Sequence, residues 1–564
     1  MLKRLLSRLL LAAVILFFVV FFFLPVGRIL KGGLSDAEGR YTLFYVLEIF
    51  RNPIYLEGLW NSFLIALCTT ALSLLLAMPL AWLSDRYEFP GKKLLTGALL
   101  LPLILPPFVG ALGMQCIFGR YGALNTLLER LSIIGVGQGS DWFAGGFWGV
   151  VLLEALHLYP ILYLNVAAAF ANVDPQLGEA AADYGCVGFK RFWRITLPLV
   201  MPGVFAGGSL VFIWSFTELG TPLMFHYGRC TAVQIYSGLN DIGNNPMPYA
   251  LVSVMLILSA AMYLGAKFFF GRGGHAMLSK AGRAATTTRL RGLPALATAV
   301  AFAIPGLFSL LPHLGVVGLA LGQSWYRTIL PSRLGLEHIE AALGHSLTVP
   351  SIINSLRYAS FAVLLAMLVG VFAAVVIVRG RGRWRWALDG LVMLPLAVPG
   401  LVLAFGYLAM SQKGYLFHCV NPVENPTILL VIAYAVRRLP YVVRAAVAGL
   451  QQTSVSYEEA AASLGAAPMT SFRRITAPLI AANLIAGAIL AFSFSMLEVS
   501  DSLILAQKAA YFPITKAIFE LSSFLGQGQA LASALGLWTM VFLGASMMTA
   551  SVLLGKKLGA LFRA

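Results

Sequence analysis

Ionisable side chains inside long apolar stretches are the residues of this sequence whose types could do chemistry. Charges are costly to bury in hydrocarbon, so such residues are functional candidates. They contain no nucleophile-base arrangement, no H-E-x-x-H motif and no carboxylate pair facing a histidine, so they do not indicate an intramembrane enzyme. Instead they are candidates for lining a translocation pathway. The candidates are Glu154, His157, Glu218, Arg437, Arg438, Glu498 and Asp501.

Three of these carboxylates fall in two equivalent segments. Glu218 and Glu498 lie near the outer ends of equivalent predicted helices, and Asp501 follows Glu498 by about one helical turn. One interpretation is that these carboxylates line the outer mouth of a cavity, where they attract a cation or help to seat a partner protein. The other is that each carboxylate caps or pins a broken helix, as beside Gly220-Thr221-Pro222. The sequence leaves both interpretations open.

Glu154 and His157 lie about one turn apart, and the internal repeat described below places His157 opposite Arg437. An ion pair of Glu154 with Arg437 or Arg438 would neutralise charges that are otherwise expensive to bury. We therefore favour this structural role over contact with cargo. Arginines suit an anionic or chelated cargo and carboxylates suit a cationic one, so charge does not identify the cargo.

The elements that must position these residues are membrane helices. Of 564 residues, 59% are hydrophobic and 11% are charged, against about 25% charged in a soluble domain. The first apolar run continues without a cleavage motif, which favours an uncleaved helix over a signal peptide. We expect an all-α polytopic membrane protein with about twelve spans. They are predicted near 9–27, 60–82, 94–118, 146–170, 199–221, 248–270, 293–321, 353–378, 386–410, 427–449, 482–504 and 531–555.

The net charge of +17 does not indicate binding of nucleic acid, because the positions of the lysines and arginines along the chain explain it. Lysines and arginines gather in every second predicted loop, as the positive-inside rule requires. Arg120, Arg327 and Arg333 are sparse exceptions. This pattern places both termini in the cytoplasm and the chain in a lipid bilayer, which we expect to be a bacterial inner membrane.

The sequence contains an internal repeat. Asn61-Ser62 recurs 293 positions later as Asn354-Ser355, and Glu218 recurs 280 positions later as Glu498, which indicates a 13-residue insertion around 119–145. We predict a first half at 1–271, a cytoplasmic linker at 272–291 and a second half at 292–564. Because each half has an even number of spans, the two six-helix halves share one orientation and a pseudo-twofold axis along the membrane normal.

Two predicted cytoplasmic loops, near 174–198 and 454–478, carry the most informative motif. Each predicts two short helices joined at a glycine, with Asp174 as N-cap before Pro175 in one copy and a Ser456 … Glu459 capping box in the other. Consecutive alanines allow close approach to another protein surface, and aromatic residues such as Phe189, Phe192, Trp193 and Phe472 offer anchors. The repeated residues are Glu179, Ala180, Ala181, Gly185, Arg194, Ile195 and Pro198, and Glu459, Ala460, Ala461, Gly465, Arg474, Ile475 and Pro478.

These residues resemble the EAA motif (EAA, three residues, G, nine residues, I-x-L-P) of the inner-membrane permeases of binding-protein-dependent ABC importers. The second copy departs from it at Ala477. The resemblance implies the type I permease fold, with each loop as a coupling helix in a groove of one of two cytoplasmic ATPase subunits. It also implies an external substrate-binding protein. The fused form, with Arg437-Arg438-Leu439-Pro440, resembles iron(III)-type permeases, whose fused relatives also handle thiamine and whose wider kin take phosphonates or polyamines.

No G-x-x-x-x-G-K-[ST] sequence occurs, so we expect ATP and Mg²⁺ to be bound by the separate ATPase and no cofactor by this chain. The lone histidines, such as His275, and the five scattered cysteines lack ligand spacing, so no metal site is predicted. The alternative from another class is an ATPase-independent carrier or channel. Such a protein would not need twin docking loops.

Overall fold

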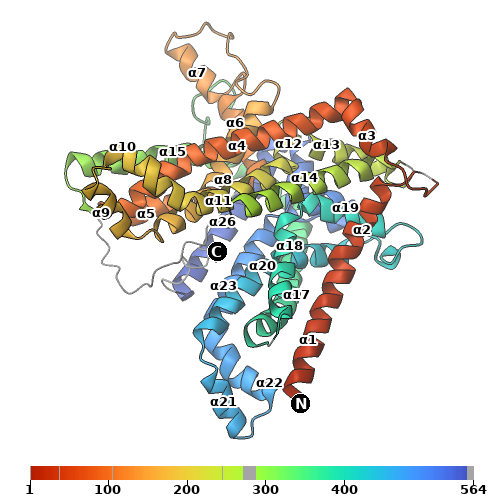
Figure 1. The fold of residues 1–564 in the computed structure, drawn as a ribbon. Helices are drawn as coiled ribbons and strands as arrows, with labels where there is room; N and C mark the ends of the chain where they lie inside the picture. Colours follow the sequence, from red (N-terminus) through yellow and green to blue (C-terminus); the bar gives the residue numbers. More distant parts are fainter. Residues whose placement is uncertain are drawn as a thin grey trace.

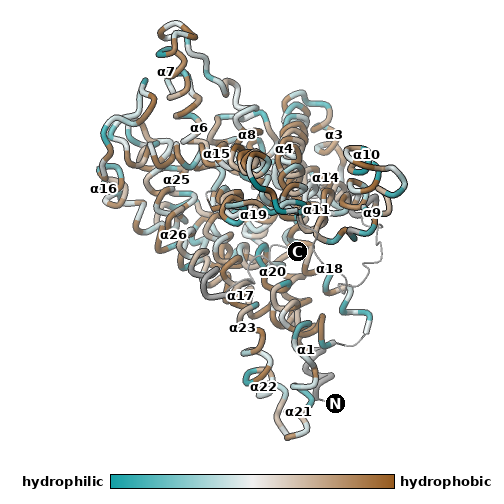
Figure 2. The backbone as a smooth tube through the Cα atoms, turned by 90° about the vertical axis from the view of Figure 1, so that its left-hand side faces the viewer, coloured by the Kyte–Doolittle hydropathy of each residue, from teal (hydrophilic) through white to brown (hydrophobic). Residues whose placement is uncertain are grey.

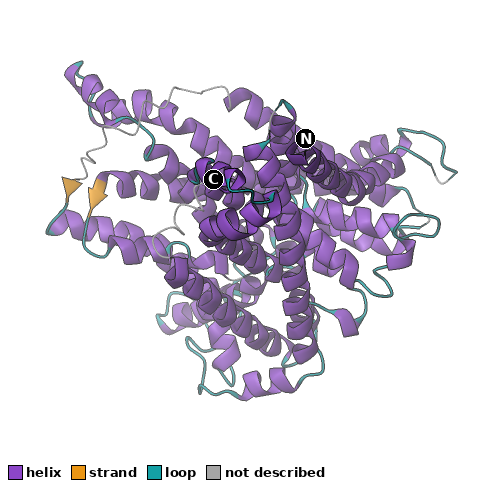
Figure 3. Ribbon diagram, turned by 90° about the horizontal axis from the view of Figure 1, so that it is seen from below, coloured by secondary structure: helices purple, strands orange, loops and turns teal. Residues whose placement is uncertain are grey.

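The structure is a computed structural model that describes residues 2–36, 38–104, 106–243, 245–270, 288–380 and 382–554. The predicted linker at 272–291 lies outside these residues as far as position 287. The described residues are overwhelmingly helical, with one short parallel strand pair, β1 (Tyr87–Glu88) and β2 (Thr288–Arg289) (Figure 3). The prediction of an all-α fold is confirmed.

The first half begins with a continuous run of helix and contains α4, the longest helix of the described residues. Its elements are α1 (Leu2–Phe18), η1 (Val19–Phe23), α2 (Leu24–Gly33), α3 (Phe44–Arg51), α4 (Pro53–Arg86), α5 (Lys92–Ala98), η2 (Leu101–Ile104), α6 (Pro107–Phe118), α7 (Ala123–Arg130), α8 (Phe147–Phe170), α9 (Pro175–Asp183), α10 (Gly188–Arg191), η3 (Phe192–Thr196), α11 (Leu197–Phe216), α12 (Gly220–Met224), α13 (Thr231–Ser237), η4 (Gly238–Asp241) and α14 (Met247–Phe270). Helix α7 lies in the predicted insertion around 119–145 and projects from the body (Figure 1).

The second half repeats this order. Its elements are α15 (Leu293–Leu321), α16 (Glu337–Gly344), α17 (Thr348–Arg379), α18 (Trp384–Ala397), α19 (Gly400–Met410), η6 (His418–Val420), α20 (Thr427–Gln452), α21 (Ser456–Ser463), α22 (Pro468–Ser471), η7 (Phe472–Thr476), α23 (Ala477–Met496), α24 (Ser500–Leu505), η8 (Ala509–Tyr511), α25 (Ile514–Ser522) and α26 (Gly528–Leu554). Helix α8 packs between α4 and α11, and α20 packs between α17 and α23 in the same way.

The asparagine-serine pairs that revealed the repeat make equivalent contacts in both halves. The Asn61 side chain donates to a backbone carbonyl of the 225–230 loop, at 2.9 Å, and that of Asn354 donates to the Ala510 carbonyl, at 3.0 Å. The neighbouring Ser62 and Ser355 hydroxyls accept backbone N–H bonds from the first residues of α13 and α25. The repeat in sequence is therefore a repeat in tertiary structure.

Fewer helices qualify as simple spans than the twelve predicted. Nine helices of the described residues are long and apolar enough to cross a membrane, or eleven if each of two bent pairs forms one span. The predicted spans 94–118 and 386–410 are these pairs, bent by 100° and 94°. Pro106 and Pro399 lie at the breaks, where proline lacks the N–H that would continue a helix. Helix α20 carries Arg437, Arg438 and Arg444 and is not among the eleven.

Each half contributes its first helix to the other half. Helices α1 and α2 pack against α17 and α19, while α15 packs against α6 (Figure 1). The Tyr407 hydroxyl of α19 donates to the Phe21 carbonyl of η1 at 2.7 Å. A Cβ on Gly315 of α15 would lie 2.5 Å from the Gly113 Cα of α6, so this crossing requires glycine. The long helices are predominantly hydrophobic (Figure 2), as an exterior facing hydrocarbon requires.

Candidate functional site

The first loop, residues 174–198, turns sharply between α9 and α10. The Asp174 carboxylate accepts a bond from the Gln176 N–H at 2.9 Å, with Pro175 as the first helical residue, so the predicted N-cap is confirmed. Gly185 follows α9 with φ +73°, a left-handed conformation that favours glycine. The predicted first short helix and the turn at the glycine are confirmed, whereas the predicted second short helix is the start of a longer helix that continues to Phe216.

The second loop, residues 454–478, has the same path through α21 and α22, and Gly465 has φ +82°. The predicted Ser456 … Glu459 capping box is wrong. Ser456 is already the first helical residue, and its N–H donates to the Ser454 hydroxyl oxygen at 3.3 Å. The helix begins one residue too early for the Ser456 side chain to occupy the N-cap position.

A feature that sequence reasoning missed follows each loop. Five-residue π-helices, η3 and η7, join α10 to α11 and α22 to α23 without a break. The resulting helices, Gly188–Phe216 and Pro468–Met496, have 29 residues each. Pro198 and Pro478 stand at the start of α11 and α23, just where the wider turn ends. A proline inside an otherwise helical pattern, present in both copies, was the signal for this irregularity.

Both loops expose large apolar side chains. Tyr184 in the first loop is 92% exposed and Leu464 at the equivalent position of the second is 88% exposed. In the first loop the exposed Phe189 ring stacks on the exposed Trp193 ring at 5.9 Å between centroids. In Figure 1 the two loops lie at separate ends of the molecule, the α9–α10 end and the α21–α22 end.

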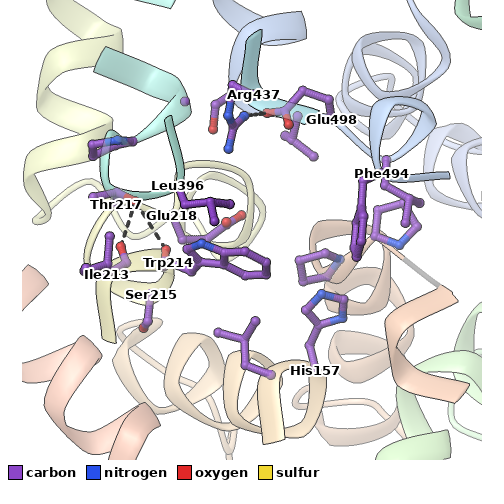
Figure 4. Close-up of a pocket in the computed structure, with 18 of the residues that line it drawn as sticks. His157, Ile213, Trp214, Ser215, Thr217, Glu218, Leu396, Arg437, Phe494 and Glu498 are labelled. Carbon is purple, nitrogen blue, oxygen red and sulfur yellow. Dashed lines mark hydrogen bonds and ion pairs between the residues drawn. The ribbon is translucent and has the colours of Figure 1, made fainter. Parts of the chain in front are cut away.

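The pathway candidates gather around a cavity of about 150 Å³ between the halves. Its walls come from α8, the end of α11 and the break at Pro106-Pro107 in the first half, and from α20, the end of α23 and the break at Pro399-Gly400 in the second. Figure 4 shows Trp214, His157 and Phe494 around the open space. The ionisable residues that line the cavity are Glu154, His157, Glu218, Arg437, Arg438 and Glu498.

The two arginines are paired within their own half. Arg437 and Arg438 each form an ion pair with Glu498, and Arg437 also lies 3.4 Å from Asp501. Arg438 donates a further bond to the Phe494 carbonyl at 2.9 Å. Asp501 is 0% exposed and is not among the described residues that line the cavity. The expectation that Asp501 adds a carboxylate to the mouth is therefore wrong, because the first turn of α24 directs it onto Arg437.

The predicted ion pair of Glu154 with Arg437 or Arg438 is also wrong. Glu498 takes both arginines, since the break after α23 brings its carboxylate directly against α20. Glu154 instead accepts a hydrogen bond from the Ser215 hydroxyl, and its Oε1 is buried without a partner in the described residues.

Glu218 combines the two interpretations that the sequence left open. Its Oε1 accepts bonds from the backbone N–H groups of Gly220, at 3.1 Å, and Thr221, at 3.3 Å, so it caps the break between α11 and α12. The same side chain lines the cavity. His157 also faces the cavity, and its Nδ1 lies 2.8 Å from the Pro102 carbonyl oxygen.

The described residues contain no group of three or more histidine, cysteine, aspartate or glutamate side chains arranged to hold a metal ion. The cysteines at 68, 116, 186, 230 and 419 are free. The cavity is therefore lined by ionisable side chains without a preformed chelating centre in that part of the chain.

Comparison with known proteins identifies the family of the chain. Residues 73–272 and 366–553 each match the family described as "Binding-protein-dependent transport system inner membrane component". The chain is 26% identical over 81% of its length to a putative ferric transport system permease protein, FbpB 1, of Haemophilus influenzae, covering 70% of that protein.

Two further relatives extend this finding. The ferric transport system permease protein FbpB of Actinobacillus pleuropneumoniae is 26% identical over 81% of this chain, which spans 64% of that protein. The molybdenum transport system permease protein ModB of Escherichia coli K12 is 36% identical over 29% of this chain and 71% of its own length. The two matches to this family together cover most of the chain. The chain therefore belongs to the inner-membrane components of binding-protein-dependent transport systems, as a multi-pass permease with two homologous halves.

Proposed function

We propose that this chain forms the substrate translocation pathway of an ATP-driven importer and that its two loops each dock one copy of a cytoplasmic ATPase. The observation that carries the proposal is one loop geometry built twice, with a left-handed glycine and exposed apolar side chains in both copies. Contiguous apolar side chains on a surface are typical of protein interaction sites. ATP and Mg²⁺ belong to the partner in this proposal.

Each loop is joined to the cavity by one helix. The helix Gly188–Phe216 leads from the first loop to Glu218, and Pro468–Met496 leads from the second loop to Glu498. At 1.5 Å per residue, 29 helical residues span about 44 Å. A displacement of a loop by the ATPase would therefore move a charged wall of the cavity. This continuity is the basis for coupling ATP hydrolysis to alternating access.

The remaining partner is a substrate-binding protein on the opposite side of the membrane. The distribution of lysines and arginines supports cytoplasmic termini and loops, in a bacterial inner membrane. In this orientation the binding protein delivers cargo to the mouth of the cavity from the periplasmic or extracellular side. Selection of cargo would then be shared between that protein and the cavity walls.

We infer iron(III) as the cargo. Three relatives that match 81% of the chain are named as ferric or Fe(3+) transport permeases, and a fourth, which matches 78% of it, has no cargo in its name. The cavity agrees with a cationic cargo, because Arg437 and Arg438 are already paired with Glu498. An oxyanion is the second candidate, since the molybdenum permease is the relative with the higher identity over its matched segment. Thiamine, phosphonate and polyamine are the remaining candidate cargoes, whose uptake is compared with that of iron(III).

The test is uptake by proteoliposomes that contain the chain with the ATPase subunits that co-purify with it. Iron(III)-loaded binding protein is added outside, ATP is enclosed inside, and iron accumulation is measured. We expect uptake that requires both ATP and the ATPase, and little uptake of molybdate, thiamine, phosphonate or polyamine. Cargo movement by the chain alone would overturn the importer proposal. ATP-dependent uptake of molybdate in place of iron would overturn only the cargo.

A further inference from the structure

The cavity walls carry unequal net charge. On the second-half wall, Arg437 and Arg438 face Glu498 and the adjacent buried Asp501, so two positive groups balance two negative ones. On the first-half wall, Glu154 and Glu218 have no basic side chain within 4.0 Å among the described residues. The two carboxyl groups of the first half are therefore the ones in this cavity that form no ion pair with a basic side chain in the described residues.

The burial of Glu154 makes this imbalance informative. The residue is only 2% exposed, it lines the cavity, and its Oε1 has no hydrogen-bond partner in the described part of the chain. A buried charged group without a counterion is strongly destabilising, and buried charges in proteins are normally paired or bound to a metal. The Ser215 hydroxyl that bonds to Oε2 is neutral and does not supply a counterion.

The surrounding groups suit a cation. Because the Pro102 carbonyl can only accept, His157 donates to it through Nδ1, and the neutral ring then has an acceptor at Nε2. Trp214 lines the cavity and extends into it near Glu218 (Figure 4), and an indole face attracts cations. Carboxylate oxygens, an imidazole nitrogen and an aromatic face thus border one space.

The repeat shows that this chemistry is confined to one half. The positions equivalent to Glu154 and His157, 280 residues later, are Tyr434 and Arg437. The Tyr434 hydroxyl is hydrogen-bonded to Ser502 at 2.7 Å and has no charge to offer. The carboxylates on the second-half wall are therefore paired with arginines, whereas Glu154 and Glu218 on the first-half wall form no ion pair within the part of the chain that the structure describes.

We propose that Glu154 and Glu218 form a cation half-site on the first-half wall, which holds a metal cation in transit through the cavity. The inference rests on the proposed import of a cationic cargo and identifies where that cargo is held. The described residues contain no three-ligand metal group, so the cation keeps water or a small ligand in its remaining positions. This arrangement suits passage, because a fully chelated ion would be released slowly.

Terbium(III) tests the half-site directly in the purified full-length chain, without ATPase or binding protein. Trp214 borders the site, so excitation of its indole should sensitise luminescence of a bound Tb³⁺. We expect a saturable signal whose dissociation constant rises about tenfold in Glu154→Gln and in Glu218→Gln. Glu154→Asp, which keeps the charge, should retain binding. Trp214→Phe, which keeps an aromatic face but removes the indole, should lose the sensitised signal.

The matched control is Asp389→Asn, which removes a carboxylate that pairs with Arg444 outside the cavity lining. It should bind Tb³⁺ like the unchanged chain. Absence of a saturable signal, or equal affinity in Glu154→Gln and Glu218→Gln, would overturn the half-site. Tb³⁺ binding that depends on both carboxylates, together with failure of iron uptake, would leave the half-site standing and reject the cargo. Normal iron uptake by the two glutamine variants would reject the half-site and keep the importer.

Discussion

In the second loop the Glu458 carboxylate accepts bonds from the Arg379 guanidinium at 3.1 Å and the Thr476 hydroxyl at 3.2 Å. Arg379 also donates to the Thr453 carbonyl at 3.0 Å, so the loop is tied to the end of α17. The equivalent residue of the first loop is Gly178, which has no side chain. There the matching arginine, Arg86, lies over the Trp82 ring instead.

The first loop, which lacks this tie to α17, has the larger exposed aromatic surface. Phe189 and Trp193 of the first loop are replaced by Met469 and Arg473 in the second. The first loop offers stacked aromatic rings on a weakly tied backbone, and the second offers a smaller apolar surface on a backbone tied to α17. The two copies therefore share the turn but differ in how the loop is held to the neighbouring helix and in the surface that it exposes. A partner that docks on both loops meets two different surfaces.

The largest expected effect tests what the loops share. Gly185→Val or Gly465→Val places a β-branched residue at φ +73° or +82°, where its backbone strain is about 1–3 kcal/mol. Nothing lies within 4 Å of a Cβ at either position, so the change acts on the turn and not through a clash. We expect cargo-stimulated ATP hydrolysis by the complex to fall by about tenfold or more in each variant.

The control for this experiment is Gly97→Val, at a glycine with ordinary φ and open space around its Cβ. It should insert into the membrane and support ATP hydrolysis like the unchanged chain. Retention of full coupling in both loop variants would contradict the assignment of these turns to the ATPase.

A smaller effect is expected from the aromatic pair. Phe189→Ala with Trp193→Ala removes two exposed rings of the kind that dominate protein interfaces, so the dissociation constant for the ATPase should rise about tenfold. Met469→Ala with Arg473→Ala, the matched change in the second loop, should raise it about threefold. Binding of the purified ATPase to immobilised permease measures both. Equal losses would show that the difference in surface has no energetic consequence.

The smallest effect concerns the anchor. Arg379→Ala removes a half-buried ion pair from the second loop, and amide hydrogen exchange of residues 456–471 should become about threefold faster. Arg86→Ala, the equivalent change in the first half, should leave exchange of residues 175–191 unchanged. If exchange in the two loops responds alike, the anchoring difference is structural detail without effect on mobility.

Much of the fold could be predicted from the sequence because its signals are local or repeated. The lengths of the apolar stretches predicted the helices, and the repeated glycines at 185 and 465 predicted both turns. The breaks at Pro106 and Pro399 could not be predicted from proline alone, because Pro160 and Pro440 lie inside continuous helices. The ion pairs could not be predicted, because the partner of Arg437 depends on how far the chain turns after α23 ends at Met496. Periodicity within a helix carries no information on that turn.

The exchange of first helices between the halves has a consequence for biosynthesis. The Tyr407 hydroxyl and the Phe21 carbonyl that it contacts are 386 residues apart in the chain. At about 5–20 residues per second, a ribosome needs roughly 20–80 s to cover that distance. During this time α1 and α2 stand in the membrane without their partners on α17 and α19. A chain that ends before α17 would leave this surface of α1 and α2 without its packing partners.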